Sequence, residues 1–258
     1  MSIKLVAIDL DDTLLDSGLK ISDKCNQAIN EVQERGILVT LATGRMFRSA
    51  LPYAGALKMD IPLITYQGAL VKNSLSRETL YYQPVPRDLG TRVMEFFKNA
   101  GIHYQAYFGD ELCMESLSPE GQYYAELSGI KPLLVENLIA ASRKHEALKI
   151  LAVCYDEDLI LQMERELKSL YGDVANITRS KPIFLEVMSN RANKGEALQV
   201  VAEHYHIQRE EVLALGDSYN DLAMIEWAGT GVAMGNARDA VKEAADYVTL
   251  SNEEEGVA

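Results

Sequence analysis

The stretch AIDLDDTL, residues 7–14, places three carboxylates at the end of an apolar run that begins at Ile3. The run, IKLVAIDL, is typical of a strand that is buried on both faces of a sheet. Asp9, Asp11 and Asp12 repel one another, and their charged forms are costly to remove from water. A fold that keeps them at the end of a buried strand must therefore supply an interaction that balances their charge.

The segments on either side of this stretch alternate between strand and helix patterns. Ser22 can cap a helix that ends near Gly36, with apolar residues spaced at i, i+3, i+4 and i+7. This first region and the last third of the chain share a β-α-β order, which predicts a parallel sheet with helices on both faces. The remaining strands are expected at 37–42, 61–66, 212–216, 231–234 and 247–250, and the remaining helices at 46–57, 193–205, 221–228 and 238–245.

The order of predicted strands and helices changes between these two regions. Helices are expected at 89–100, 135–143 and 159–170, and strands at 103–108, 111–115, 148–155 and 183–187. This order contains hairpins and predicts a separate mixed α+β unit. The fold class is therefore α/β, with a Rossmann-like doubly wound parallel sheet formed by residues 1–83 and 188–258 and an insertion at 84–187.

Composition excludes several classes of partner. The chain of 258 residues carries a net charge of −13, which argues against nucleic acid or an anionic membrane as the main partner. No run approaches the ~20 apolar residues of a membrane span, and acids follow the first residues too soon for a signal peptide. The three cysteines form no CxxC pair, which fits a reducing compartment. We expect a cytoplasmic protein.

Polar side chains gather where the predicted parallel strands end. Open parallel sheets bind ligands at this edge. Magnesium prefers oxygen ligands and combines one or two carboxylates with water and phosphate oxygens, so such an edge suits Mg²⁺ and a phosphate. The residues expected there are Asp9, Asp11, Thr13, Thr43, Gly44, Arg45, Lys194, Asp217, Asn220 and Asp221.

The same residue types suit phosphoryl transfer. A carboxylate such as that of Asp9 can attack phosphorus, and a second carboxyl group can protonate the leaving alkoxide and then deprotonate water. Lys194, Thr43 and backbone N–H groups can hold the phosphoryl oxygens as charge spreads over them.

Four ordered segments, DLDDTLL, LATGR, NKG and GDSYND, resemble the four motifs of the haloacid dehalogenase superfamily. The long insertion between the second and third segments resembles that of the Cof-type branch. This resemblance implies a Mg²⁺-dependent phosphatase with a mobile cap that forms an aspartyl-phosphate intermediate. It also implies a small phosphorylated metabolite as substrate, with a sugar phosphate favoured.

The resemblance further implies a role for each motif residue. Asp9 would be the nucleophile and a metal ligand, and Asp11 would be the general acid/base and lend its backbone carbonyl to the metal. Asp217 would also bind the metal, with support from Asp221. The implied phosphate-binding residues are Leu10 and Gly44 through their backbone amides, Thr43, Lys194 and Asn220.

Some residues allow two interpretations or depart from the family pattern. Arg45 could bind phosphate, but a structural ion pair is favoured, and Thr43 could also cap the following helix. The branch commonly has NGA after the third strand, whereas this chain has YQGAL with Gln67 in place of Asn. The role of this loop is therefore open. GTGVAMG (229–235) is not a dinucleotide site because it leads from a helix into a strand.

Several functions remain open from the sequence. A phosphomutase of the same superfamily would pass the phosphoryl group to a sugar instead of water. A receiver domain that is phosphorylated on aspartate ranks low, because such domains are about half as long and carry no insertion. The insertion would select the substrate, with Tyr104, Tyr107 and Tyr123 as candidates. Pyridoxal phosphate and flavin mononucleotide are alternative substrates, and the sequence does not assign an oligomeric state.

Overall fold

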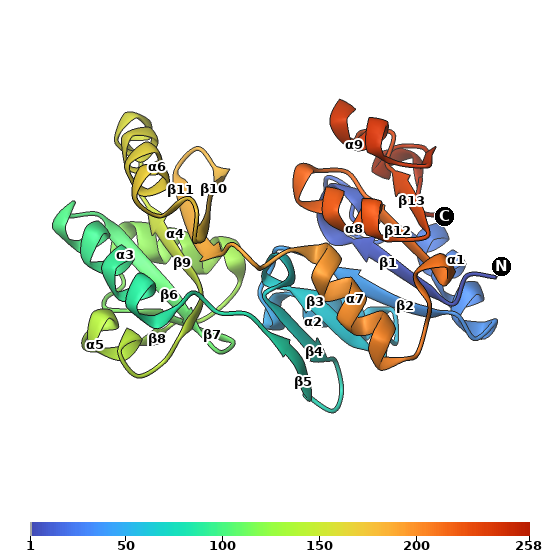
Figure 1. The fold of residues 1–258 in the computed structure, drawn as a ribbon, viewed down its shortest axis with the longest axis horizontal. Coiled ribbons are helices and arrows are strands. Elements are labelled where there is room, and N and C mark those ends of the chain that lie inside the picture. Colours follow the sequence, from blue (N-terminus) through green and yellow to red (C-terminus); the bar gives the residue numbers. More distant parts are fainter. Residues whose placement is uncertain (1) are drawn as a thin grey trace. The chain divides into compact units, whose positions relative to one another are not determined.

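The computed structural model describes residues 2–258 and divides into two compact units (Figure 1). The core unit runs to Tyr82 and resumes at Asn193–Ala258, and the inserted unit is Gln83–Ala192. The inserted unit extends past Val187, where the sequence pattern placed its end, because β11 (Phe184–Ser189) continues to Ser189.

The core unit contains an eight-stranded sheet in the order β14-β13-β12-β1-β2-β3-β4-β5. Six of the strands are parallel and correspond to the predicted ones. Two short antiparallel strands, β4 and β5, extend one edge and were not predicted. The bounds are β1 (Leu5–Asp9), β2 (Leu38–Ala42), β3 (Pro62–Thr65), β4 (Leu70–Asn73), β5 (Thr79–Tyr82), β12 (Val212–Gly216), β13 (Thr230–Ala233) and β14 (Tyr247–Val248).

Helices cover both faces of this sheet. The chain leaves β1 toward β2 and leaves β12 in the opposite direction, toward β13. Because both crossovers are right-handed, their helices lie on opposite faces of the sheet. Thus α8 lies on the face opposite α1 and α2, and α7 packs against α8. The helices are α1 (Asp23–Glu34), α2 (Phe47–Ala56), α7 (Lys194–His204), α8 (Leu222–Trp227) and α9 (Asp239–Ala244).

The strand order reverses between β1 and β12. The chain leaves β1 toward β2 and β3, and later strands are added on the other side, beginning with β12. Leu5 pairs with Val212 and Ile8 with Leu215, so both strands end at the same edge. A ligand site in a doubly wound sheet forms at such a reversal. Asp9 is the last residue of β1, and Asp217 directly follows β12.

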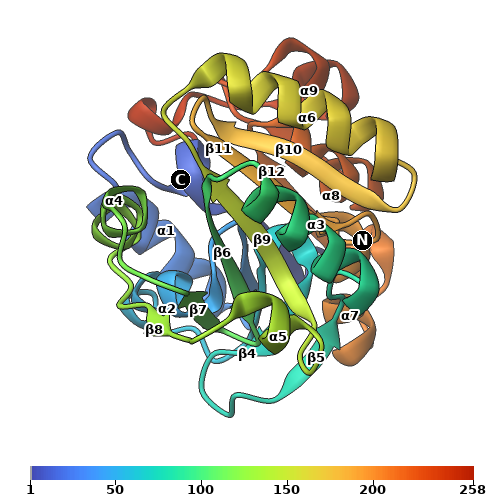
Figure 2. The same cartoon turned by 90° about the vertical axis from the view of Figure 1, so that its left-hand side faces the viewer.

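The inserted unit is a six-stranded sheet with α3, α5 and α6 packed on the face that carries its apolar core, as Figure 2 shows for α3 and α5, whereas α4 contacts the other face through Tyr124, which meets Tyr107 and Phe184. Its apolar core includes Phe97, Ile150 and Met163. The strand order is β10 (Ala175–Lys181), β11, β9 (Ala147–Val153), β6 (His103–Phe108), β7 (Glu111–Met114) and β8 (Leu133–Leu134). The helices are α3 (Arg87–Asn99), α4 (Pro119–Ser128), α5 (Leu138–Ser142) and α6 (Glu157–Tyr171).

Among residues 2–258, no helix combines the length and apolar character needed to cross a membrane.

Candidate active site

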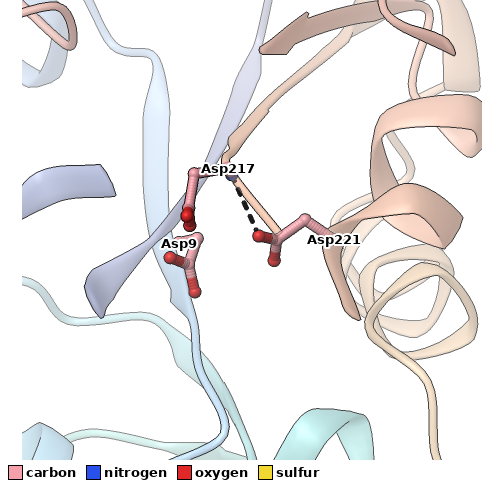
Figure 3. A group of neighbouring side chains, drawn as sticks. All are labelled: Asp9, Asp217 and Asp221. Atoms are coloured by element: carbon pink, nitrogen blue, oxygen red, sulfur yellow. Dashed lines mark hydrogen bonds between the residues drawn. The ribbon is translucent and has the colours of Figure 1, made fainter. Parts of the chain in front are cut away.

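Three carboxylates meet where the strand order reverses (Figure 3). One oxygen atom from each of Asp9, Asp217 and Asp221 lies within 4.8 Å of the others. Burial and the charge of Asp221 raise the pKa of Asp9 well above its usual value. Burial, Asp221 and Asp12 also raise the pKa of Asp217 to about 6. In both groups burial and the nearby carboxylates together disfavour the charged form.

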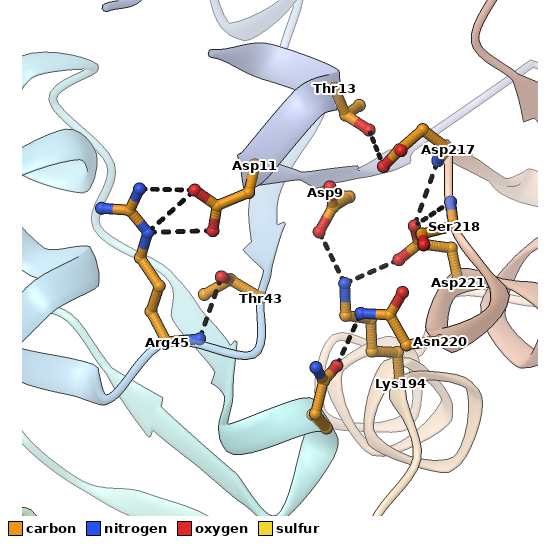
Figure 4. A network of polar contacts seen from close by, with 11 residues as sticks. Asp9, Asp11, Thr13, Thr43, Arg45, Lys194, Asp217, Ser218, Asn220 and Asp221 are labelled. Carbon is orange, nitrogen blue, oxygen red and sulfur yellow. Dashed lines mark hydrogen bonds and ion pairs between the residues drawn. The ribbon is translucent and has the colours of Figure 1, made fainter. Parts of the chain in front are cut away.

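Among residues 2–258, Lys194 supplies the one positive charge inside this cluster (Figure 4). Its Nζ donates to Oδ1 of Asp9 and to Oδ1 of Asp221, at 2.6 Å each. The side chain is fully buried. Burial alone would lower the pKa of Lys194, but the carboxylates of Asp221 and Asp9 outweigh it and raise that pKa above its usual value. Lys194 is therefore a fixed ammonium group, and Asn193 positions it by capping α7.

Both carboxylate oxygen atoms of Asp221 accept hydrogen bonds from other groups of the protein. Oδ1 binds Lys194, and Oδ2 accepts from the backbone N–H of Asp217 at 3.1 Å and of Ser218 at 3.0 Å. The carboxylate therefore holds the loop after β12 in place. The Ser218 amide is a contact that sequence patterns do not reveal, because it depends on the shape of the loop.

Asp9 and Asp217 keep oxygen atoms available. Within the described residues, Oδ2 of Asp9 accepts no hydrogen bond, and Asp217 accepts one from Thr13 Oγ1 at 3.2 Å, on Oδ1. Three carboxylates face one ammonium group, so the cluster has excess negative charge and free oxygen donors. That donor set fits a divalent cation that prefers oxygen ligands.

Asp11 does not point into this cluster but pairs with Arg45 (Figure 4). The guanidinium Nε donates to Oδ2 of Asp11 at 2.9 Å, and Nη2 donates to Oδ1. Arg45 also donates to the Tyr53 hydroxyl at 3.2 Å and lies over the Tyr53 ring, 5.1 Å from its centroid. The structural ion pair favoured for Arg45 is therefore present, and its partner is the proposed acid/base residue.

The loop after β2 brings Thr43 and Gly44 to the same edge. Thr43 is fully buried, and its Oγ1 accepts from the Arg45 N–H at 3.1 Å. A Cβ on Gly44 would lie 2.3 Å from Nε2 of Gln67. The Gln67 carboxamide therefore occupies the space beside Gly44 that a Cβ would take. Gln67 in turn accepts from Asn220 Nδ2 at 2.8 Å on its Oε1.

The structure thus brings together most of the predicted site residues. Leu10 lies directly after Asp9 and is fully buried. Asn220 lies on the short helical turn between Asp217 and α8 and is exposed. Tyr53 of α2 contacts the site through Arg45. No sequence motif identified Tyr53, and its position in the predicted helix is the only feature of the sequence that points to it.

Comparison with known families identifies the chain. The family profile of haloacid dehalogenase-like hydrolases matches residues 6–258. The chain belongs to this family. The hydrolase is therefore an enzyme of a phosphatase family, as the sequence resemblance implied.

Curated relatives of the hydrolase match over almost their whole length. It is 34% identical to the 5-amino-6-(5-phospho-D-ribitylamino)uracil phosphatase YcsE of Bacillus subtilis, covering 100% of this chain and 94% of that protein. It is 32% identical to the phosphatase YwtE of the same organism, named for the same substrate, over 99% of this chain and 96% of that protein.

Solved structures also match the hydrolase along its length. A haloacid dehalogenase-like hydrolase from Bacteroides thetaiotaomicron has a TM-score of 0.89 at 36% identity, covering 99% of this chain and 97% of that one. TM0651 from Thermotoga maritima has a TM-score of 0.91 at 33% identity, covering 99% and 95%. The predicted fold class, a doubly wound core with an inserted α+β unit, is confirmed.

Proposed function

We propose that the hydrolase is a Mg²⁺-dependent phosphomonoesterase that forms an aspartyl-phosphate (acyl phosphate) intermediate on Asp9. The observation that carries this proposal is the placement of Asp9. It lies at the strand-order reversal, one oxygen is held by the buried Lys194 ammonium at 2.6 Å, and the other accepts no hydrogen bond from the described residues. Such a carboxylate is oriented and has a free oxygen for attack on phosphorus.

The acidic cluster is proposed to hold the magnesium ion. Its ligands would be the carboxylates of Asp9 and Asp217 and the backbone carbonyl of Asp11. When bound, the ion would offset the repulsion between these carboxylates and the substrate phosphate. Asp221 would act mainly by holding Lys194 and the loop at Asp217, because both of its oxygens already accept hydrogen bonds from the chain.

The remaining residues at this edge would hold the phosphoryl group. Lys194 provides a fixed ammonium group, and Thr43 and Asn220 provide polar side chains near the same loop ends. The backbone amides of Leu10 and Gly44 would complete the cradle. Donors that are positioned before the reaction stabilise the charge that spreads over the phosphoryl oxygens.

Asp11 is proposed to act as the general acid and then as the general base. Both of its oxygens are engaged by Arg45 in this structure. Its carboxyl group therefore has to leave the guanidinium before it can donate a proton to the leaving oxygen. After phosphoryl transfer, the ionised form would take a proton from the water that attacks phospho-Asp9.

Replacing Asp11 by Asn is expected to slow alkyl phosphates far more than aryl phosphates. An alkoxide leaving group needs a proton, whereas a nitrophenolate leaves without one. The loss on alkyl phosphates should be ~100-fold or more, the range of general acid–base catalysis. Rapid-quench analysis should also trap phospho-Asp9, because its hydrolysis loses the base. Unchanged rates on both substrates, with no trapped intermediate, would assign the role to another residue, with Asp12 tested next.

Removal of divalent metal is expected to stop turnover. Asp9 and Asp217 lie in one cluster where, of the residues that the structure describes, only Lys194 balances them, so a phosphate dianion would be repelled without a cation. Treatment with EDTA should abolish phosphate release, and added Mg²⁺ should restore it. Full activity after thorough chelation, checked by elemental analysis, would contradict the proposed site.

The proposed substrate is a phosphomonoester of a sugar or a sugar alcohol. The two relatives described above are named for a substrate with a phosphorylated ribityl chain, which is an open-chain polyol. The inserted unit is proposed to select the leaving group. A panel of phosphorylated metabolites assayed with Mg²⁺ tests the substrate class. Release of free phosphate supports a hydrolase, whereas an isomerised sugar phosphate would indicate a mutase.

A further inference from the structure

The turn that follows β3 has an unusual backbone. Tyr66 has φ +52°, Gln67 has φ +57° and Gly68 has φ +96°. Left-handed backbone is disfavoured for residues with a Cβ, and it persists where surrounding contacts fix it. Two such residues in succession therefore indicate a turn that is held in place by the structure around it.

Segments that carry the proposed phosphate-binding residues supply those contacts. The Tyr66 N–H donates to the Arg45 carbonyl at 2.9 Å, and the Gln67 N–H donates to the Thr43 carbonyl at 3.1 Å. A Cβ on Gly68 would lie 2.1 Å from the Asn193 carbonyl oxygen, so the turn also packs against the residue before Lys194. The turn thus joins the loop after β2 to the start of α7.

The Gln67 side chain adds a third connection. Its Oε1 accepts from Asn220 Nδ2 at 2.8 Å, across 153 residues of sequence, and its Nε2 lies against Gly44. Within the described residues, Nε2 of Gln67 has no hydrogen-bond partner. Every fully buried side-chain nitrogen or oxygen atom in those residues has a partner, so Nε2 is not fully buried. The Nε2 group is therefore open to solvent beside the Gly44 backbone.

Asn220 depends on this contact. It lies on an exposed turn, and the bond to Gln67 is the one hydrogen bond that its side chain makes among residues 2–258. Without that bond, the Asn220 carboxamide would be free to rotate into solvent. Two carboxamides from distant segments thus form a bridge between the turn after β3 and the loop after β12.

We propose that Gln67 is a positioning residue for the phosphate: it holds Asn220 in place and presents its own Nε2 donor beside Gly44. The proposal rests on the proposed function, because it assigns phosphate to this edge. An Asn side chain is one methylene shorter than Gln and would not span the gap to Asn220 in the same way.

The test is a double-mutant cycle on phosphate binding. Gln67→Met keeps the chain length and the packing on Gly44 but removes both hydrogen-bonding atoms. With Mg²⁺ present, the dissociation constant of inorganic phosphate is measured by titration calorimetry for the wild type, Gln67→Met, Asn220→Ala and the double variant. Each single variant should weaken binding by about fivefold, the change typical of one hydrogen bond. The double variant should bind phosphate about as weakly as the weaker-binding single variant, because the effects of coupled residues on binding free energy are not additive.

Matched controls separate this role from a general effect on the fold. Gln27→Met removes a hydrogen bond between exposed side chains on α1, from Gln27 Nε2 to Glu31, and should leave phosphate binding unchanged. Gln67→Asn keeps a carboxamide on the same backbone and should bind phosphate as weakly as Gln67→Met. Melting temperatures of all variants report folding, and a purely structural defect would change them without producing coupling to Asn220.

Three outcomes would overturn the inference: wild-type binding by Gln67→Met, full rescue by Gln67→Asn, or additive losses in the double variant. The proposed function is tested separately, because calorimetry needs no turnover. A wild-type protein that binds phosphate but hydrolyses no ester would overturn the hydrolase proposal alone. Normal hydrolysis by Gln67→Met with unchanged phosphate affinity would overturn the role of Gln67 alone.

Discussion

Asp9→Asn is expected to abolish turnover while the protein remains folded. An amide has nearly the shape of a carboxylate but is a poor nucleophile, so the residual rate should be below about a hundredth of the wild-type rate. The measurement is phosphate release from p-nitrophenyl phosphate and from a sugar phosphate. A variant that keeps more activity than this would remove Asp9 from the nucleophile role.

The fold of this variant should not be weakened in the metal-free protein. Burial and the neighbouring Asp221 raise the pKa of Asp9, so its ionised form is disfavoured in the folded state. A group whose pKa is raised on folding costs stability at pH values where it is ionised. Asn removes that charge, and the melting temperature at neutral pH should stay the same or rise.

Asp16→Asn is a matched control for Asp9→Asn. Asp16 lies in the same N-terminal loop, where its Oδ1 accepts from the backbone N–H of Gly18 at 2.8 Å and of Lys20 at 2.9 Å. An Asn carbonyl oxygen can accept the same two bonds. The control variant should therefore keep its turnover, and a comparable loss would show that the loop is sensitive to any change.

Lys194→Met is expected to cause the second largest effect, on both turnover and stability. Met fills a similar volume but leaves the buried carboxylates of Asp9 and Asp221 without their counter-charge. Breaking a buried ion pair by removing one partner typically costs ~3–5 kcal/mol in the free energy of unfolding. Urea unfolding of the metal-free protein measures this loss. Phosphate release should also fall sharply, because the proposed phosphate ligand is removed.

A second buried lysine provides the control for this prediction. Lys149 of β9 pairs with Glu186 at 3.4 Å in the inserted unit, and both side chains are buried. Lys149→Met should also destabilise the protein, but turnover of a small aryl phosphate by the folded fraction should persist. If Lys194→Met keeps wild-type turnover, or if both variants lose it equally, Lys194 has no specific part in the chemistry.

The sequence by itself determined the core elements and the motif positions. Continuous apolar runs such as Leu38–Ala42 and the Ser22 cap of α1 are local signals, because strand burial and helix capping depend on neighbouring residues. The β-α-β order then implied that the carboxyl ends of the parallel strands meet at one edge. That rule alone is enough to predict that Asp9 and Asp217 lie close together.

Elements without a local signal were missed. Strand β5 (Thr79–Tyr82) has no buried residue, and its apolar pattern is correspondingly weak. Helix α4 (Pro119–Ser128) buries only Gly121, so its apolar residues show no helical stripe, although Ser118 caps it. Such elements form because tertiary contacts hold them, and periodicity does not report those contacts.

Only the tertiary structure decided which partner each site residue has. Lys194 bonds Asp9, which lies 185 residues away in the sequence. Arg45 pairs with Asp11, whereas the sequence indicated an ion pair for Arg45 but did not identify its partner. Gln67 bonds Asn220 because a left-handed turn, the close approach to Gly44 and the loop after β12 meet at one edge of the sheet. A hydrogen bond forms only when its donor and acceptor lie within a few tenths of an ångström of their preferred separation, about 2.9 Å. For side chains from distant segments this separation follows from packing, which no local pattern encodes.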